Sequence, residues 1–87
     1  MNEGNSLDSN TASSEMILLH YELDFGLSMA ELALASLLLG ERAESDGWKN
    51  HALDALTSAS ATAARLSIVD TTASNQLNEL AVRVSAL

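Results

Sequence analysis

The chain has 87 residues, which is enough for one domain at most. It contains no proline and no cysteine, and the lack of cysteine excludes disulfide bonds and thiolate metal sites. With 47% hydrophobic residues, and alanine and leucine abundant among them, the composition predicts an all-α fold. The net charge of −8 at pH 7 would repel phosphate groups, so we expect neither nucleic acid nor an anionic membrane surface as a partner.

Targeting and membrane-spanning segments are not expected from the sequence. The first residues lack the basic region and apolar core that characterise a secretory signal. The most apolar run, residues 27–39, is too short to cross a bilayer and is interrupted by Glu31. We therefore expect a cytoplasmic protein.

Residues 1–12 are polar apart from a few positions and are predicted to form a disordered tail. Residues 13–87 are predicted to form a single helical domain. Its first helix should begin near Ser13 or Ser14, because serine suits the N-cap position and Glu15 then lies in the first turn. The helix should end before Gly47, since glycine readily adopts the left-handed conformation found just past helix ends.

Two apolar stripes run along this first helix. The inner stripe has the spacing of a helix that faces a core, and consists of Met16, His20, Leu23, Leu27, Ala30, Leu34 and Leu37. The second stripe consists of Leu18, Phe25, Met29, Leu32, Leu39 and Ala43. A surface helix ordinarily has one apolar face. The second stripe should therefore be covered either by the other helices or by a second chain.

The second helix is expected from about Trp48 to about Val69. Its stripe is mostly small and consists of Trp48, Ala52, Ala55, Ala59, Ala63, Leu66 and Val69. Small side chains let two helices approach closely, so this helix should form an antiparallel hairpin with the first. A third helix is expected from about Thr71 to Ala86, with Asp70 as its N-cap, and would complete a three-helix bundle.

The boundary between the second and third helices admits an alternative. No glycine or proline enforces a break there, and the stripes join in phase through Leu66, Val69 and Ala73. One continuous helix from about Trp48 to the C-terminus would overhang the first helix. Two such long helices would then dimerise as a four-helix bundle.

Glycine, aromatic and small residues recur at fixed spacings in residues 33–66. A Leu-Gly pair is followed by a second glycine, a tryptophan and two alanines: Leu39, Gly40, Gly47, Trp48, Ala52 and Ala59. This pattern resembles one helical hairpin of the tetratricopeptide repeat family, although Ser36, Ala43 and Ala64 stand where that family has Trp, Tyr and Pro. The resemblance implies that Gly40, Ala52 and Ala59 permit a close helix crossing. The three-helix MIT type has a similar length, and both families commonly bind peptide segments of partner proteins.

The sequence offers little that could perform chemistry. His20 lies on the inner stripe, and a phospho-accepting histidine of a dimerisation domain is a remote alternative to a core or interface histidine. His51 and Asp54 are spaced to touch on one helix face, and Glu41, Glu44 and Asp46 form an acidic cluster without the ordered spacing of a calcium loop. We therefore predict a protein that is not an enzyme, with no catalytic, cofactor-binding or metal-binding residues and no cofactor.

The expected function is that of a small helical protein–protein interaction module that self-associates, as a dimer, through its first helix. The candidate interface residues are Leu18, Phe25, Met29, Leu32, Leu39 and Trp48. Trp48 belongs to this set because tryptophan is over-represented at interfaces, although a plug that closes the end of the bundle is the simpler interpretation of this residue. The alternative function is a regulatory adaptor that binds a helix or tail of a partner protein.

Overall fold

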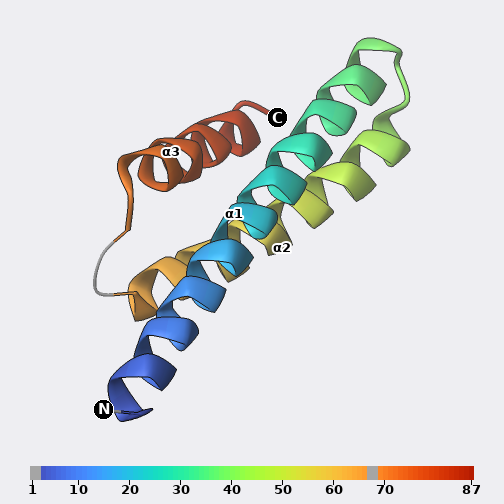
Figure 1. Ribbon diagram of the computed structural model, residues 1–87. Coiled ribbons are helices and arrows are strands. Elements are labelled where there is room, and N and C mark those ends of the chain that lie inside the picture. The colour runs from blue at the N-terminus through green and yellow to red at the C-terminus, as the bar shows by residue number, and fades with distance from the viewer. Residues whose placement is uncertain (1–2, 67–68) are drawn as a thin grey trace.

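The computed structural model describes the backbone of residues 3–66 and 69–87, and the side chains of residues 14–66 and 69–87. Within these residues the chain forms three helices and no strand: α1 (Glu3–Leu38), α2 (Arg42–Arg65) and α3 (Thr71–Ser85). Helices α1 and α2 form an antiparallel hairpin, and α3 turns back beside them (Figure 1). The predicted all-α class is therefore confirmed.

The core lies where the three helices meet. Its large side chains come from α1 and α3, whereas α2 contributes alanines. The core consists of Leu19, Leu23, Ala30, Ala52, Ala59, Ala73, Leu80 and Val84. The predicted small-residue face of α2 is confirmed, because Ala52, Ala55 and Ala59 are all buried. Gly26 on α1 is packed closely against Leu80 and Ala55, whereas a Cβ at Gly40, where the repeat-family resemblance implied a close helix crossing, would meet nothing within 4 Å.

The hairpin turns at residues 39–41, seven residues earlier than expected. Gly40 has a φ of +80°, and its N–H donates to the Leu37 carbonyl while the Glu41 N–H donates to the Ser36 carbonyl. These two bonds form the Schellman motif that ends many helices. The prediction that Gly47 ends the first helix, with Trp48 at the turn, is wrong, because both residues lie inside α2. Left-handed backbone is needed where α1 stops, and Gly40 provides it there.

The closed end of the hairpin is fastened by one buried hydrogen bond. Ser45, in the first turn of α2, is buried and donates its hydroxyl to the Ala33 carbonyl on α1 at 2.7 Å. This hydrogen bond explains why a polar residue is tolerated between α1 and α2, since a buried polar group needs a partner.

The second and third helices are separate. Helix α2 ends at Arg65, four residues before the expected end, and the alternative of one continuous second helix is wrong. Asp70 has extended backbone (φ −68°, ψ 161°) and accepts a hydrogen bond from the Ala73 N–H at 2.6 Å, so its predicted role as N-cap of α3 is confirmed. The expected extension of the second helix over residues 67–68 lies outside the described residues.

The first helix is longer than expected at its N-terminal end, since α1 begins at Glu3 and not at Ser13 or Ser14. The predicted tail, residues 1–12, includes residues 1–2 and the side chains of residues 3–12, which lie outside the described part of the chain. Its disorder in solution stays a prediction.

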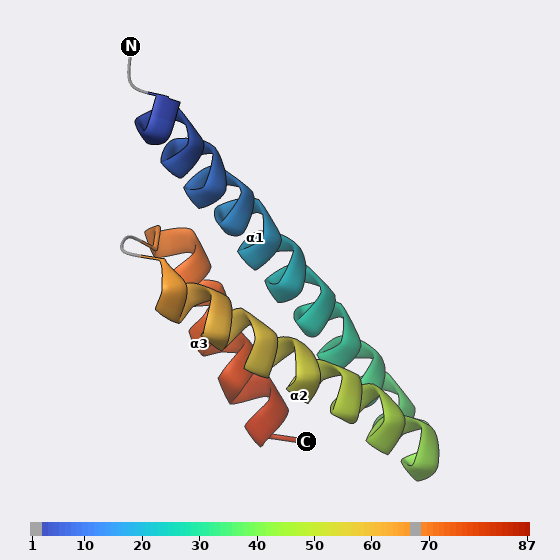
Figure 2. The ribbon, with the colours of Figure 1, turned by 90° about the horizontal axis from the view of Figure 1, so that it is seen from below.

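Helix α3 is shorter than the hairpin on which it packs. It contacts both α1 and α2 and ends well before the closed end of the hairpin (Figure 2). Beyond the α1 residues Ala30 and Leu34, which line a pocket with Arg83, Ala86 and Leu87, α1 and α2 are therefore held only by each other.

Candidate interaction surface

The inner stripe of α1 is only partly internal. Leu23 and Ala30 are buried and Met16, His20 and Leu27 are half-buried, but Leu34 and Leu37 are exposed. The expectation that the whole stripe faces the core is therefore wrong for its last two members. At this end of α1 the buried positions are Ala33 and Ser36, each one residue before these leucines.

The second stripe of α1 faces solvent along most of its length. Leu18, Phe25 and Leu32 are each roughly half exposed, and Leu39 is 74% exposed. Met29 is the exception, because its half-buried side chain packs against the core. The first of the two possibilities, that the other helices cover this stripe, is therefore wrong for most of its length. Whether a partner covers it stays a prediction.

Three further exposed positions complete a continuous seam on this side of α1. Tyr21, which is 71% exposed, Ser28 and Ala35 fall between the residues of the second stripe. Leu39 continues the seam past the end of α1, because its N–H still bonds the Ala35 carbonyl in the helical manner. We call these seven positions the outer seam: Leu18, Tyr21, Phe25, Ser28, Leu32, Ala35 and Leu39.

The outer seam has the alternating spacing of three and four residues that defines a coiled-coil contact line. Reasoning from the sequence missed Tyr21 as an interface residue, although this spacing was visible in the chain. The missing information was the rotation of α1 about its axis, which only the packing of α2 and α3 reveals.

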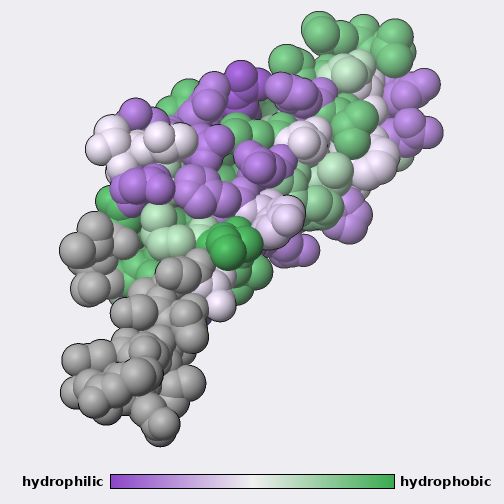
Figure 3. Space-filling view, viewed as in Figure 1, coloured by the Kyte–Doolittle hydropathy of each residue, from purple (hydrophilic) through white to green (hydrophobic). Residues whose placement is uncertain are grey.

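Exposed apolar side chains also flank the seam and cap the hairpin. Ile17 and Leu38 lie one residue before Leu18 and Leu39 and are 58% and 79% exposed. Hydrophobic side chains gather at the closed end of the hairpin, beyond α3 (Figure 3). The apolar surface therefore extends along α1 to the hairpin turn.

Trp48 lies in the second turn of α2, where it is half-buried. Its ring is 6.1 Å from that of His51, centroid to centroid, and the two residues line a shallow depression of about 360 Å³ with Glu44 and Gly47. The structure therefore places this candidate on α2, away from the seam of α1. A second depression of about 310 Å³ lies beside the seam, between the α1 residues Tyr21, Glu22 and Phe25 and the α2 residues Asp54, Ala55 and Ser58.

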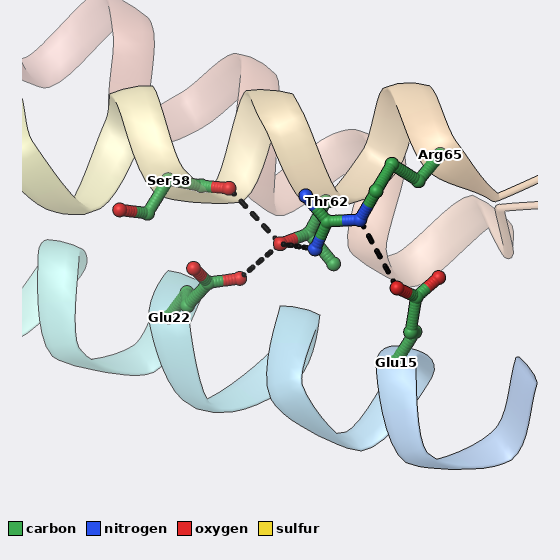
Figure 4. A network of polar contacts seen from close by, with 5 residues as sticks. All are labelled: Glu15, Glu22, Ser58, Thr62 and Arg65. Carbon is green, nitrogen blue, oxygen red and sulfur yellow. Dashed lines mark hydrogen bonds and ion pairs between the residues drawn. The ribbon is translucent and has the colours of Figure 1, made fainter. Parts of the chain in front are cut away.

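A polar network joins α1 and α2 at the open end of the hairpin (Figure 4). The buried Thr62 hydroxyl lies 2.8 Å from Glu22 Oε1 and 3.0 Å from the Ser58 carbonyl, to either of which it can donate. It accepts from Arg65 Nη2 at 3.2 Å, and Arg65 Nε donates to Glu15 Oε1 at 3.0 Å. The buried Thr62 hydroxyl thus has partners on both helices, and the network joins α1 to α2.

His20 makes a structural contact. Its Nε2 lies 3.2 Å from Asp70 Oδ2, so α1 is joined to the N-cap of α3. The backbone N–H of Ala73 lowers the pKa of the Asp70 carboxyl, against a smaller desolvation effect, and His20 lowers it further. The contact places His20 between α1 and the start of α3.

The acidic residues at the hairpin turn are exposed. Hydrogen bonding to Glu44, together with the charge of Glu44, raises the pKa of Glu41 above its ordinary value. In the part of the chain that the structure describes, no group of three or more His, Asp or Glu side chains is placed to hold a metal ion. Among the same residues, no helix is long and apolar enough to cross a bilayer.

Comparisons with protein-family models, curated proteins and solved structures give no match for this chain. The exposed surface of α1 is therefore the basis for the proposed function.

Proposed function

We propose that the chain is a non-enzymatic interaction module that associates with a second copy of itself through the outer seam of α1. The observation that carries the proposal is the continuity of the seam. Its seven positions extend for about 32 Å at the helical rise of 1.5 Å per residue. Five of them are large apolar or aromatic residues that are 41–74% exposed.

The energy available from this surface is of the size that a dimer needs. Burying a leucine or phenylalanine completely is worth about 1.5–3 kcal/mol, so burying the exposed half is worth roughly 1 kcal/mol. Two seams with five large side chains each would supply on the order of 10 kcal/mol by this measure. Association costs about 4–15 kcal/mol, so the gain is comparable with the cost.

The composition of the seam favours a second copy as the occupant. A symmetric dimer brings the same patch of both chains together, so the patch must be compatible with itself. The outer seam contains no charged residue, whereas the chain as a whole carries a net charge of −8. Two copies can therefore meet along the seam without opposing like charges at its centre.

Size-exclusion chromatography with light scattering tests the proposal. The wild-type chain should have the mass of a dimer, and Phe25→Asp or Leu32→Asp should reduce it to that of a monomer, because each puts a charge in the middle of the seam. The matched control is Val82→Asp, which makes the same kind of change at an exposed position of α3 outside the seam. It should remain dimeric.

A wild-type chain that is monomeric at high micromolar concentration would overturn the proposal. In that case the alternative, an adaptor that binds an amphipathic helix of another protein along the same seam, would become the better explanation of the exposed surface. Equal loss of the dimer in Val82→Asp would also count against the seam, since it would show that any added charge separates the copies.

A further inference from the structure

The distribution of large and small residues along the outer seam bears on the direction in which a second copy docks. Leu18, Phe25 and Leu32 occupy one set of positions, and Tyr21, Ser28 and Ala35 the other. In a parallel pair, every residue would face its own copy, so Phe25 would meet Phe25 while Ser28 met Ser28. Overfilled layers would then alternate with underfilled ones, and both are unfavourable in a packed interface.

We infer that α1 pairs with α1 of a second copy in antiparallel orientation, so that Leu18 faces Ala35, Phe25 faces Ser28 and Leu39 faces Ser14 of the other chain. This inference rests on the proposed self-association. Each of the three pairs places a large side chain against a small one, which fills the layers evenly. The remaining pair is Tyr21 with Leu32, where the tyrosine ring can cover the leucine while its hydroxyl reaches solvent.

The residues beside the seam support the same direction. Ile17 and Leu38 lie on one flank of α1, next to the seam, and are 58% and 79% exposed. Antiparallel pairing brings Ile17 of each chain beside Leu38 of the other, at both ends of the interface. In a parallel pair the two residues would be separated by 21 residues, or about 32 Å along the helix.

The same flank also carries acidic residues. Antiparallel pairing places Asp24 of each chain near Glu31 of the other, so two pairs of like charges face each other at the edge of the interface. Glu31 lies 3.9 Å from Arg83 Nη1 on α3, which offsets part of its charge. On the opposite flank, Glu22 would meet Met29 of the second copy, and Glu22 is already bonded to Thr62.

Cross-linking distinguishes the two directions, and the lack of cysteine in the chain makes it clean. Leu18→Cys and Ala35→Cys are prepared as separate chains, one with a short peptide tag, and are treated singly and mixed with a thiol-reactive cross-linker. The linker should span about 8 Å, the close end of the range between packed helix axes. Positions 18 and 35 are about 26 Å apart along one helix, so a linker of this length cannot join chains paired in the wrong direction.

The antiparallel pair should give a cross-linked product of mixed mass in the mixture, and no product from either variant alone. Products from each variant alone, without the mixed product, would overturn the inference in favour of a parallel pair. A second pair of variants, Tyr21→Cys and Leu32→Cys, repeats the test if either substitution impairs folding. Val82→Cys measures cross-linking by random collision.

Light scattering on the same samples separates this inference from the function on which it rests. Dimeric variants that cross-link in the parallel pattern, or not at all, would overturn the antiparallel direction and leave self-association intact. Monomeric wild-type protein would overturn both.

Discussion

Leu80 on α3 packs directly onto the backbone of Gly26 on α1. A Cβ atom built at Gly26 would lie 2.6 Å from Leu80 Cδ2 and 3.0 Å from the Cβ of Ala55 on α2, both closer than ordinary contact. Glycine at this position therefore lets all three helices meet at one point.

We expect Gly26→Ala to lower the free energy of unfolding by about 1 kcal/mol. Overpacking costs about 1–3 kcal/mol, and the better helix propensity of alanine returns about 1 kcal/mol of it. Urea unfolding followed by circular dichroism measures the change. The matched control is Gly47→Ala, since a Cβ there meets nothing within 4 Å and should stabilise α2 by about 0.5–1 kcal/mol. A Gly26→Ala protein as stable as the wild type would mean that Leu80 can move aside freely.

Gly40→Ala should also destabilise the chain, for a different reason. No atom crowds Gly40, but its φ of +80° is unfavourable for any residue with a Cβ. The expected loss is about 1–2 kcal/mol, the cost of left-handed backbone for an ordinary L-residue. Gly40→Asn should lose less, because asparagine tolerates this conformation better. Equal losses for the two variants would contradict the assignment of the effect to backbone conformation.

The Asp70 cap makes stability depend on pH. The pKa of this carboxyl is lower in the folded chain than its ordinary value of 3.8, so the charged form favours folding. Its contribution is complete above the ordinary pKa and is lost as the pH falls through the folded-state pKa. Asp70→Asn, which keeps a capping oxygen, should flatten the stability profile below about pH 4.

Thermal unfolding of the wild type and Asp70→Asn over this pH range measures the effect. Asp54→Asn, on the exposed face of α2, removes the same charge and is the control. If the two variants had identical profiles, the pH dependence would not come from the cap.

The acidic flank of the proposed antiparallel dimer should respond to Asp24→Asn. Removing this charge abolishes both like-charge pairs with Glu31, each of which costs about 0.2–0.5 kcal/mol, so the dissociation constant should fall roughly two- to fivefold. Analytical ultracentrifugation at low salt measures it. Asp46→Asn changes the net charge equally at the exposed N-terminal part of α2 and should have a smaller effect. A gain of the same size in both would indicate general repulsion between the chains.

The sequence predicted those features of the fold that depend on local chemistry. The helical class follows from composition, the Asp70 cap from a side-chain oxygen three residues before the N–H that it accepts, and the burial of Ala52 and Ala59 from their spacing. The position of the hairpin turn could not be predicted in the same way. Gly40 and Gly47 are both plausible helix ends, and only the tertiary structure decides which of them takes a positive φ.

The candidate surface was partly predictable for a related reason. The second stripe of α1 is visible as a pattern, but the pattern alone does not determine whether α2 and α3 cover it. The exposure of Leu34, Leu37 and Tyr21 depends on how α1 is rotated against its neighbours, which bury Ala33 and Ser36 in place of the two leucines.

The polar contacts at the two ends of the hairpin have a consequence for how α1 and α2 are aligned along their length. Ala52, Ala55 and Ala59 have identical side chains. An alanine face by itself would therefore pack almost as well if α2 slid along α1 by one helical turn. The Ser45 hydroxyl on the Ala33 carbonyl and the Thr62 hydroxyl beside Glu22 each permit one alignment of the helices. These hydrogen bonds therefore determine how far α2 is shifted along α1, which the alanines alone would leave open, and with it which residues of the two helices lie side by side at the surface.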